Sequence, residues 1–153
     1  MTLVIVFSSC NRGPLFEEVY NFTDNTWQRI EEDLRFEVEI EDEEQRYDID
    51  IPIRYTGDYP HQYLEVGINI YAPSGQENIN VRKIYLVDEN LHRRGEQSGE
   101  VWDYTFRLFD EYKFNERGTY IVEIQNLTGN NFYLRGISRL GLEVRRSKEG
   151  SRD

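Results

Sequence analysis

The clearest chemistry in the sequence lies at positions 7–10, which read Phe-Ser-Ser-Cys, and Cys10 is the only cysteine of the chain. The apolar run 3–7 leads into this motif, and a polar segment beginning with Asn11 follows it. A lipoprotein signal peptidase requires small side chains before the cleaved bond and a cysteine after it, whose thiol carries a diacylglycerol. We therefore interpret Cys10 as a lipidation site and as the first residue of the mature protein.

The segment 1–9 lacks two features of a complete signal peptide. It carries no basic residue, and its apolar run is shorter than the usual stretch of about 7–15 residues. We expect a start codon further upstream, which makes 1–9 a residual signal segment. The alternative is that residues 3–7 form a buried edge strand and that Cys10 is a packed thiol, because free cysteine behaves as a small hydrophobic residue. A lone cysteine provides no disulfide framework and no thiolate metal site.

Composition narrows the classes of partner. The length of 153 residues is typical of one domain, and an aromatic content of 14% is typical of a folded chain. The 18 Lys and Arg residues against 29 Asp and Glu give a net charge of −11, so we expect no nucleic-acid partner. The same charge opposes binding to anionic lipid, which leaves the acyl anchor as the expected membrane contact.

Residues suited to catalysis or metal binding are sparse. His61 and His92 both lie in turn or loop contexts, and the chain contains no nucleophile elbow, His-Glu-x-x-His motif or Gly-rich phosphate loop. We therefore predict no catalytic residue, no metal and no cofactor. Acidic residues that could form one face and hold Ca²⁺ are Glu37, Glu39, Glu41, Asp42, Glu43, Glu44, Asp48 and Asp50. We interpret them as a solvated face, since flat strand faces rarely enclose an ion.

Aromatic residues offer an alternative binding chemistry, because stacked rings can hold a sugar or a peptide. The candidates for such a platform are Trp27, Tyr59, Tyr63, Trp102, Tyr112 and Tyr133. Aromatic residues of a sandwich of this size commonly divide between the core and its rim. A carbohydrate-binding face is therefore the second hypothesis.

The elements that must position these residues follow a period of two, which is the signature of half-buried strands. Segments 36–40, 47–55 and 64–72 alternate apolar and polar residues, and turn residues separate them. Pro52 indicates an edge or a bulge within its strand. The alternation changes phase after Val81, which predicts a β-bulge near residues 82–83.

The pattern predicts an all-β fold, namely an antiparallel β-sandwich of seven or eight strands that is immunoglobulin-like or jelly-roll-like. The expected divisions are the residual signal segment 1–9, a tether and lead-in at 10–24, the sandwich at 25–146 and a charged tail at 147–153. Tyr120 is expected to anchor a corner of the sandwich through its hydroxyl. The expected core residues are Phe36, Val38, Ile49, Ile51, Val66, Ile68, Ile70, Phe106, Tyr120, Val122, Leu142 and Val144.

Local patterns in a fixed order carry a family resemblance. An acidic and aromatic stretch follows Cys10, and then come the segments 55–60, 72–75, 118–120 and 141–144. In this order they resemble the gliding-motility-associated lipoproteins of Bacteroidetes, of the GldH type, and the resemblance extends to about Arg146. The family's loop after its Leu-x-Asp element usually holds more glycines and an aromatic residue. Residues 90–94 differ from that pattern, so contacts of that loop are not carried over.

The resemblance implies an outer-membrane lipoprotein of the gliding and protein-secretion apparatus, with envelope proteins as partners and no catalytic residues. Only Cys10 is carried over by position. A polar Asn11 permits sorting to the outer membrane, and no acidic run directly follows Cys10, which favours the periplasmic face. We therefore expect a non-catalytic scaffold, with a carbohydrate-binding module as the alternative and a small hydrolase as the third class.

The anchor hypothesis is tested by Cys10→Ala in the protein expressed from the full-length gene. We expect the mature variant to lose membrane association and stay folded. Each buried methylene contributes about 0.8 kcal/mol, so stable anchoring needs about two acyl chains, and the acidic domain adds no attraction. Membrane fractionation with labelled palmitate measures this. Equal membrane recovery of the variant, or no label on the wild type, would make residues 3–10 ordinary structure.

Overall fold

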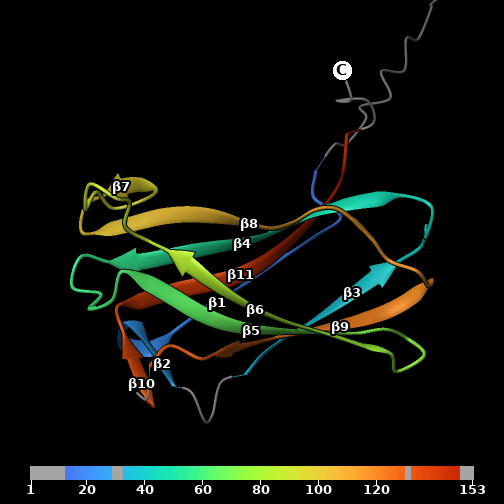
Figure 1. Cartoon of the computed structure of the whole chain (residues 1–153), viewed down its shortest axis with the longest axis horizontal. Coiled ribbons are helices and arrows are strands. Elements are labelled where there is room, and N and C mark those ends of the chain that lie inside the picture. Colours follow the sequence, from blue (N-terminus) through green and yellow to red (C-terminus); the bar gives the residue numbers. More distant parts are fainter. Residues whose placement is uncertain (1–12, 29–32, 130–131, 149–153) are drawn as a thin grey trace, which may run out of the picture.

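The computed structural model describes residues 13–28, 33–129 and 132–148, and these are mostly β-strand (Figure 1). Cys10 therefore lies outside the described residues. The elements in chain order are β1 (Phe16–Asn21), the 3-10 turn η1 (Thr23–Asn25), β2 (Thr26–Gln28), β3 (Leu34–Ile40), β4 (Arg46–Thr56), β5 (Tyr63–Tyr71), β6 (Glu77–Tyr85), β7 (Glu96–Ser98), β8 (Val101–Lys113), β9 (Gly118–Asn126), β10 (Tyr133–Arg135) and β11 (Ile137–Arg146).

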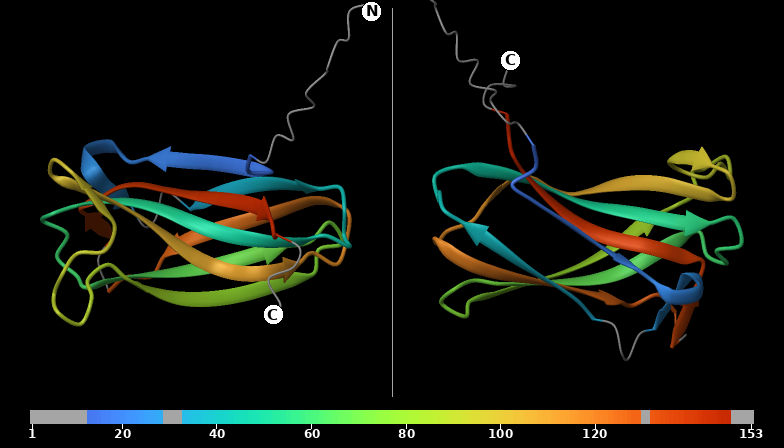
Figure 2. Two further views of the ribbon diagram at one scale, coloured as in Figure 1. Left: turned by 90° about the horizontal axis from the view of Figure 1, so that it is seen from above. Right: turned by 180° about the vertical axis from the view of Figure 1, so that it is seen from behind.

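Two antiparallel sheets pack face to face (Figures 1 and 2). The five-stranded sheet has the order β1-β11-β4-β8-β7, the four-stranded sheet has the order β3-β9-β5-β6, and β2 pairs with β10 in a small ribbon. The predicted all-β antiparallel fold is confirmed. The described residues hold eleven strands rather than seven or eight. The additional strands β2, β7 and β10 have three residues each, too few to show a period in sequence.

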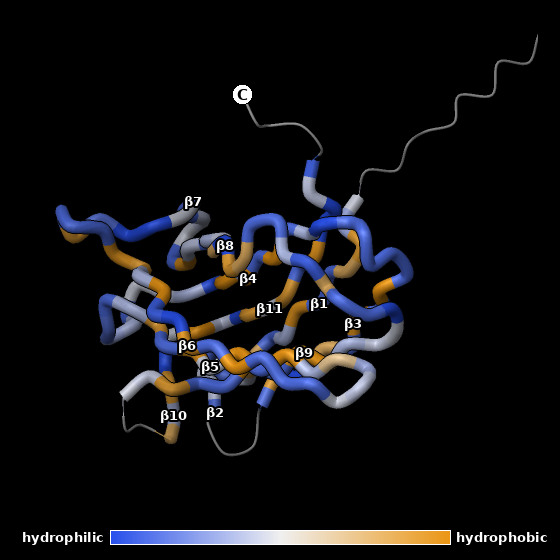
Figure 3. The backbone as a smooth tube through the Cα atoms, turned by 45° about the vertical axis from the view of Figure 1, so that its right-hand side comes forward, coloured by the Kyte–Doolittle hydropathy of each residue, from blue (hydrophilic) through white to orange (hydrophobic). Residues whose placement is uncertain are grey.

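Hydrophobic and hydrophilic residues alternate along the long strands (Figure 3). This period of two places one face of β3, β4, β5, β9 and β11 in a shared core. In β3 the apolar side chains are buried and the charged side chains between them are exposed. All the predicted core residues are buried except Phe106, which is half-buried. Each large apolar side chain removed from water contributes roughly 1.5–3 kcal/mol, so this shared core is the main source of stability.

The structure places Pro52 neither on an edge strand nor at a bulge. Pro52 lies in β4, a central strand between β11 and β8, so the edge prediction is wrong. It faces Thr105 of β8, and the register shifts of that ladder lie between Tyr47 and Asp50 instead. On the β11 side the paired positions go from Ile53 to Asp50, so that ladder passes over the proline. A residue without an N–H group is tolerated at such a position.

The five-stranded sheet begins within the segment expected to be a tether. Residues 16–21 form β1, which pairs along its whole length with β11, and the amide of Leu15 already bonds the carbonyl of Val144 at 2.8 Å. The rings of Phe16 and Tyr20 pack edge-on against Phe36 of the other sheet, with centroids 6.2 and 5.4 Å away. The ordered domain thus starts before residue 25.

Tyr120 forms the predicted corner. Its side chain is only 4% exposed, and its hydroxyl accepts a 3.0 Å hydrogen bond from the amide of Glu116, four residues upstream. Burial raises the pKa of this hydroxyl, and the bond from Glu116 opposes that rise. The contact fixes the turn between β8 and β9.

Tyr120→Phe is expected to lower the free energy of unfolding by about 1 kcal/mol, because the Glu116 amide loses its acceptor while the ring stays packed. Denaturant unfolding measures the change. Tyr133→Phe is the matched control, since Tyr133 is 64% exposed and should tolerate the change. Equal stability of the wild type and Tyr120→Phe would show that the corner bond is not stabilising.

Candidate binding site on the side between β6 and β8

The inner face of β8 is incompletely covered. Its side chains lie opposite buried residues of β4, for example Phe106 opposite Ile51 and Tyr104 opposite Ile53, so they share the core face. Apart from Leu108, which is buried, they are nevertheless only half-buried. The aromatic residues of this row are Trp102, Tyr104, Phe106, Phe109 and Tyr112. Aromatic side chains that are packed on one side and open on the other are typical of binding surfaces.

Strand β6, opposite this row, supplies polar side chains. Asn78, Asn80 and Arg82 lie opposite the buried β5 residues Ile70, Ile68 and Val66 and so occupy inward positions. We call the region formed by these three residues and the aromatic row of β8 the β6–β8 side.

Polar and cation–π contacts join the two sheets here. The Asn78 amide donates to the Tyr112 hydroxyl at 3.1 Å, and the Arg82 guanidinium lies 5.5 Å from the centre of the Phe109 ring. Such contacts are individually weak. This side can therefore exchange its contacts for those of a ligand at lower cost than the aliphatic core.

The predicted bulge at residues 82–83 is wrong, and its correction explains this side. The β5–β6 ladder runs without a register shift, with Val66 opposite Arg82 and Leu64 opposite Ile84. Val81 is on the outer face and 52% exposed, whereas Ile84 is on the inner face and buried. The change of phase in the sequence arises because the apolar residues before it lie on the outer face and those after it lie on the inner face. Interpreted in this way, the sequence would have predicted that the inward positions before Ile84 are polar.

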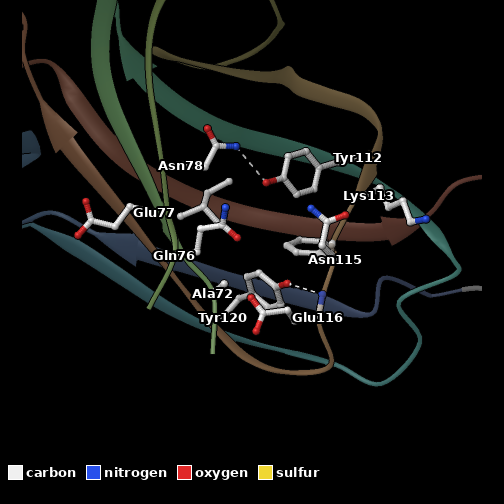
Figure 4. A pocket seen from close by; sticks show the side chains of 11 residues that line it. Ala72, Gln76, Glu77, Asn78, Tyr112, Lys113, Asn115, Glu116 and Tyr120 are labelled. Atoms are coloured by element: carbon white, nitrogen blue, oxygen red, sulfur yellow. Dashed lines mark hydrogen bonds between the residues drawn. The ribbon is translucent and has the colours of Figure 1, made fainter. Parts of the chain in front are cut away.

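A cavity of about 220 Å³ lies at one end of the β6–β8 side, between the turn after β5 and the turn after β8 (Figure 4). Its lining residues are Ile70, Ala72, Gln76, Glu77, Asn78, Tyr112, Lys113, Phe114, Asn115, Glu116 and Tyr120. We call it the Tyr112 pocket. Its amides, carboxylates and ammonium group can hydrogen-bond a polar ligand beside the ring of Tyr112. This described lining includes no histidine, cysteine or serine, so it offers hydrogen bonding without an evident nucleophile.

A second, larger cavity of about 600 Å³ lies beyond Trp102 at the other end of β8. The ring of Trp102 contacts an aromatic ring and a cation there. Its ring stacks on Tyr55 at a centroid distance of 6.0 Å, and the Arg93 guanidinium lies 5.1 Å from it. Gly57 lies against the same ring, since an added Cβ would be 3.2 Å from it. Arg93 also donates to the Gly57 carbonyl, which holds the cation in place.

The six aromatic residues considered as a sugar platform do not form one face. Trp27 and Tyr59 are buried in the core, and Tyr133 is exposed on β10. Tyr63 packs beneath Lys83, whose nitrogen is 5.0 Å from the ring centre. Trp102 and Tyr112 alone among the six line the two described cavities, and they lie at opposite ends of β8.

The histidines and the acidic residues are also dispersed. His61 packs against Tyr59, and its buried Nε2 has no partner among the described residues. His92 is exposed beside Asp88, at 3.7 Å. Glu37 and Glu39 lie on β3, whereas Asp48 and Asp50 lie on β4 of the other sheet, so the expected single acidic face is divided. Over the described ranges, no three His, Cys, Asp or Glu side chains are grouped to hold a metal.

Arg107 holds the acidic residues of β4. Its Nε lies 2.5 Å from the Asp50 carboxylate, and Nη1 lies 3.4 Å from Asp48. Asp50 is 7% exposed. Burial alone would raise the pKa of Asp48, but bonds from the Glu111 amide and Ser147 and the charge of Arg107 outweigh it and lower that pKa. These carboxylates are therefore structural.

The geometry defines an all-β domain of two packed antiparallel sheets with one open, polar and aromatic side. Comparison with known proteins identifies the family: the model of the GldH lipoprotein family matches residues 14–144, and the chain belongs to this family. It is similar to the gliding motility lipoprotein GldH homolog of Christiangramia forsetii, with 27% identity over 137 residues that cover 90% of this chain and 83% of the relative. The resemblance seen in the sequence is thus confirmed. Among the described residues, no helix has the length and apolarity to span a membrane.

Arg107→Ala is expected to lower the free energy of unfolding by about 2 kcal/mol at pH 7, because Asp50 would keep a nearly buried charge without its partner. The loss should shrink as the pH falls below 3.8, the ordinary pKa of Asp48. The folded pKa of Asp48 lies below that value, so its stabilisation is present above it and is lost at lower pH. Denaturant unfolding between pH 7 and pH 2 measures both effects.

Arg35→Ala is the matched control, since its pair with Glu37 is exposed and 3.8 Å long. It should change stability by less than about 1 kcal/mol. A loss in Arg107→Ala no larger than in this control would contradict a stabilising role of the Arg107 network.

Proposed function

We propose that the protein is a non-catalytic, lipid-anchored interaction component of the gliding and secretion apparatus, and that its β6–β8 side binds a segment of an envelope protein. Membership of the GldH lipoprotein family supports the setting. The aromatic row of β8 supports the binding role, because aromatic residues are enriched in interface cores. We further propose attachment through Cys10 to the outer membrane, at its periplasmic face.

The observation that carries this proposal is the half-burial of the β8 row. Phe106 lies at the centre of this row and pairs with the fully buried Ile51, yet it is itself only half-buried. The β6 side chains that contact the row are polar, namely Asn78 at Tyr112 and Arg82 at Phe109. A core position left half-covered leaves apolar area that a partner can remove from water, at roughly 25 cal/mol per Å². The amides of Asn78 and Asn115 at the rim would then bond the backbone of the partner.

Carbohydrate binding is the second candidate, and the Tyr112 pocket favours it. This pocket combines one aromatic ring with amides and carboxylates, which is the chemistry that recognises sugar hydroxyls. Its volume of about 220 Å³ is smaller than the roughly 300–1,000 Å³ of typical ligand pockets. We therefore favour a protein segment that extends beyond the pocket along β8.

Asn115→Trp tests the proposed function, because Asn115 is exposed at the mouth of the Tyr112 pocket and a large ring there should fill it. We expect a strain carrying this variant to spread on agar as poorly as a strain that lacks the gene. The amount of protein in the membrane fraction should be unchanged. Colony spreading and immunoblotting of membranes provide the measurements.

Asn90→Trp is the matched control, since Asn90 is an exposed residue outside the lining of either cavity described above. Its strain should spread like the wild type. Normal spreading of the Asn115→Trp strain would contradict a role for the pocket. Binding of the purified wild type to envelope polysaccharide, abolished by Asn115→Trp, would favour the carbohydrate alternative.

A further inference from the structure

Strand β6 is the long open edge of the four-stranded sheet. It lies last in the order β3-β9-β5-β6 and has nine residues (Figure 1). Other edges in the described part of the chain are protected. The carbonyl of Arg35 in β3 accepts a 3.0 Å bond from the Tyr20 hydroxyl, β1 carries exposed Glu17 and Glu18, and β7 has three residues. Charged or capped edges resist pairing, whereas a long edge with apolar residues invites it.

The register shows which backbone groups of β6 are unused by β5. The amide of Ala72 bonds the carbonyl of Gln76, and the amide of Leu86 bonds that of Gln62, at the two ends of one unbroken ladder. Hydrogen-bonded and non-bonded pairs alternate in an antiparallel ladder. The even-numbered residues of β6 therefore face β5, and the odd-numbered ones direct their N–H and C=O groups outward. In agreement, the Val81 carbonyl accepts a bond from the Arg82 side chain.

The odd-numbered side chains lie on the outer face of the sheet. Ile79 and Val81 are 67% and 52% exposed, and Glu77 and Lys83 flank them with opposite charges. In the sequence order Glu77, Ile79, Val81, Lys83, an acid and a base enclose two β-branched residues. An antiparallel copy of this row brings acid opposite base and apolar residue opposite apolar residue. The row is therefore complementary to itself.

We propose that β6 pairs antiparallel with β6 of a second copy of this chain, with the two Asn80 residues facing each other across the two-fold axis. Ile79 then lies opposite Val81 of the other copy, and Glu77 lies opposite Lys83. These outward-directed pairs are the hydrogen-bonded ones, and each exchanges two bonds, so the strands form about eight. The arrangement joins two four-stranded sheets into one continuous sheet.

Charge favours this surface over others for self-association. The chain has a net charge of −11, so two copies repel through most of their surfaces. Strand β6 carries Glu77 against Arg82 and Lys83 and is locally positive. A shift of the register that places Val81 opposite Val81 also places Lys83 opposite Ile79 and Glu77 opposite Tyr85, which separates the charges. The Asn80-centred register is the one that satisfies both pairs.

The oligomeric state of the full chain carrying Cys10→Ser tests the proposal, by sedimentation at several concentrations. We expect a concentration-dependent dimer. Val81→Lys should weaken the dimer about tenfold or more, because it places a charge opposite Ile79 at two symmetry-related positions. Val19→Lys is the matched control, since Val19 is 38% exposed on a strand of the other sheet, and it should leave the dimer intact.

Disulfide trapping tests the register independently, because Cys10→Ser leaves the chain without other thiols. Asn80 forms a non-hydrogen-bonded pair with itself, with Cα atoms about 4.5 Å apart, within the range of a disulfide. Asn80→Cys should therefore cross-link under mild oxidation. Two Val81 residues are diagonal neighbours about 7–8 Å apart, so Val81→Cys should not.

Charge reversal completes the test. Glu77→Lys alone should weaken the dimer, and Glu77→Lys with Lys83→Glu should restore it. A monomeric wild type at all concentrations, a dimer unaffected by Val81→Lys, or cross-linking of Val81→Cys in preference to Asn80→Cys would overturn the proposal. Asn115→Trp should dimerise normally, so failure of the proposed function and failure of this inference are distinguishable.

Discussion

The open side of the domain depends on the polar side chains that β6 directs toward the aromatic row of β8. Where β9 and β5 face β11 and β4, aliphatic side chains from both layers are fully buried. Towards β8 the covering strand is β6, whose inward residues Asn78, Asn80 and Arg82 are polar. The core therefore ends in aromatic residues that are packed from one side, and the exposed side of the molecule arises from the polar inward residues of β6 rather than from a loop.

Tyrosine hydroxyls hydrogen-bond backbone carbonyls that the β-ladders leave without a partner strand. The hydroxyl of Tyr47 donates to the Asp42 carbonyl at 3.0 Å, that of Tyr59 to the Tyr63 carbonyl at 2.8 Å, and that of Tyr55 reaches the carbonyls of Leu86 and Arg94. In each case the ring lies in the core and the oxygen satisfies a backbone group of a turn, a connection or a strand end. Tyr47, Tyr55 and Tyr59 thus serve both the core and the backbone around it.

The sequence was most informative where one residue type dominates one face. The alternation in β3, β4 and β5 predicted their buried residues correctly, and Tyr120 was placed at its corner from the turn that precedes it. It was least informative on β6, because polar residues at inward positions and apolar residues at outward positions imitate a bulge. Which residues of β6 face inward depends on its pairing with β5 and on the sheet opposite. A local sequence pattern contains neither piece of information. The division of the acidic residues between two sheets was hidden for the same reason.

The early start of β1 has a consequence for how far the domain can stand from a membrane. If Cys10 carries the lipid, the covalent path from the anchor to Leu15, whose amide is the first bonded to β11, spans five residues and reaches at most about 18 Å. A tether that ended at residue 24 would reach roughly 50 Å. The acidic sandwich would thus begin within about 18 Å of the leaflet. The beginning of β1 and the end of β11 would lie nearest to it. A partner would have to reach the domain at that distance from the membrane surface.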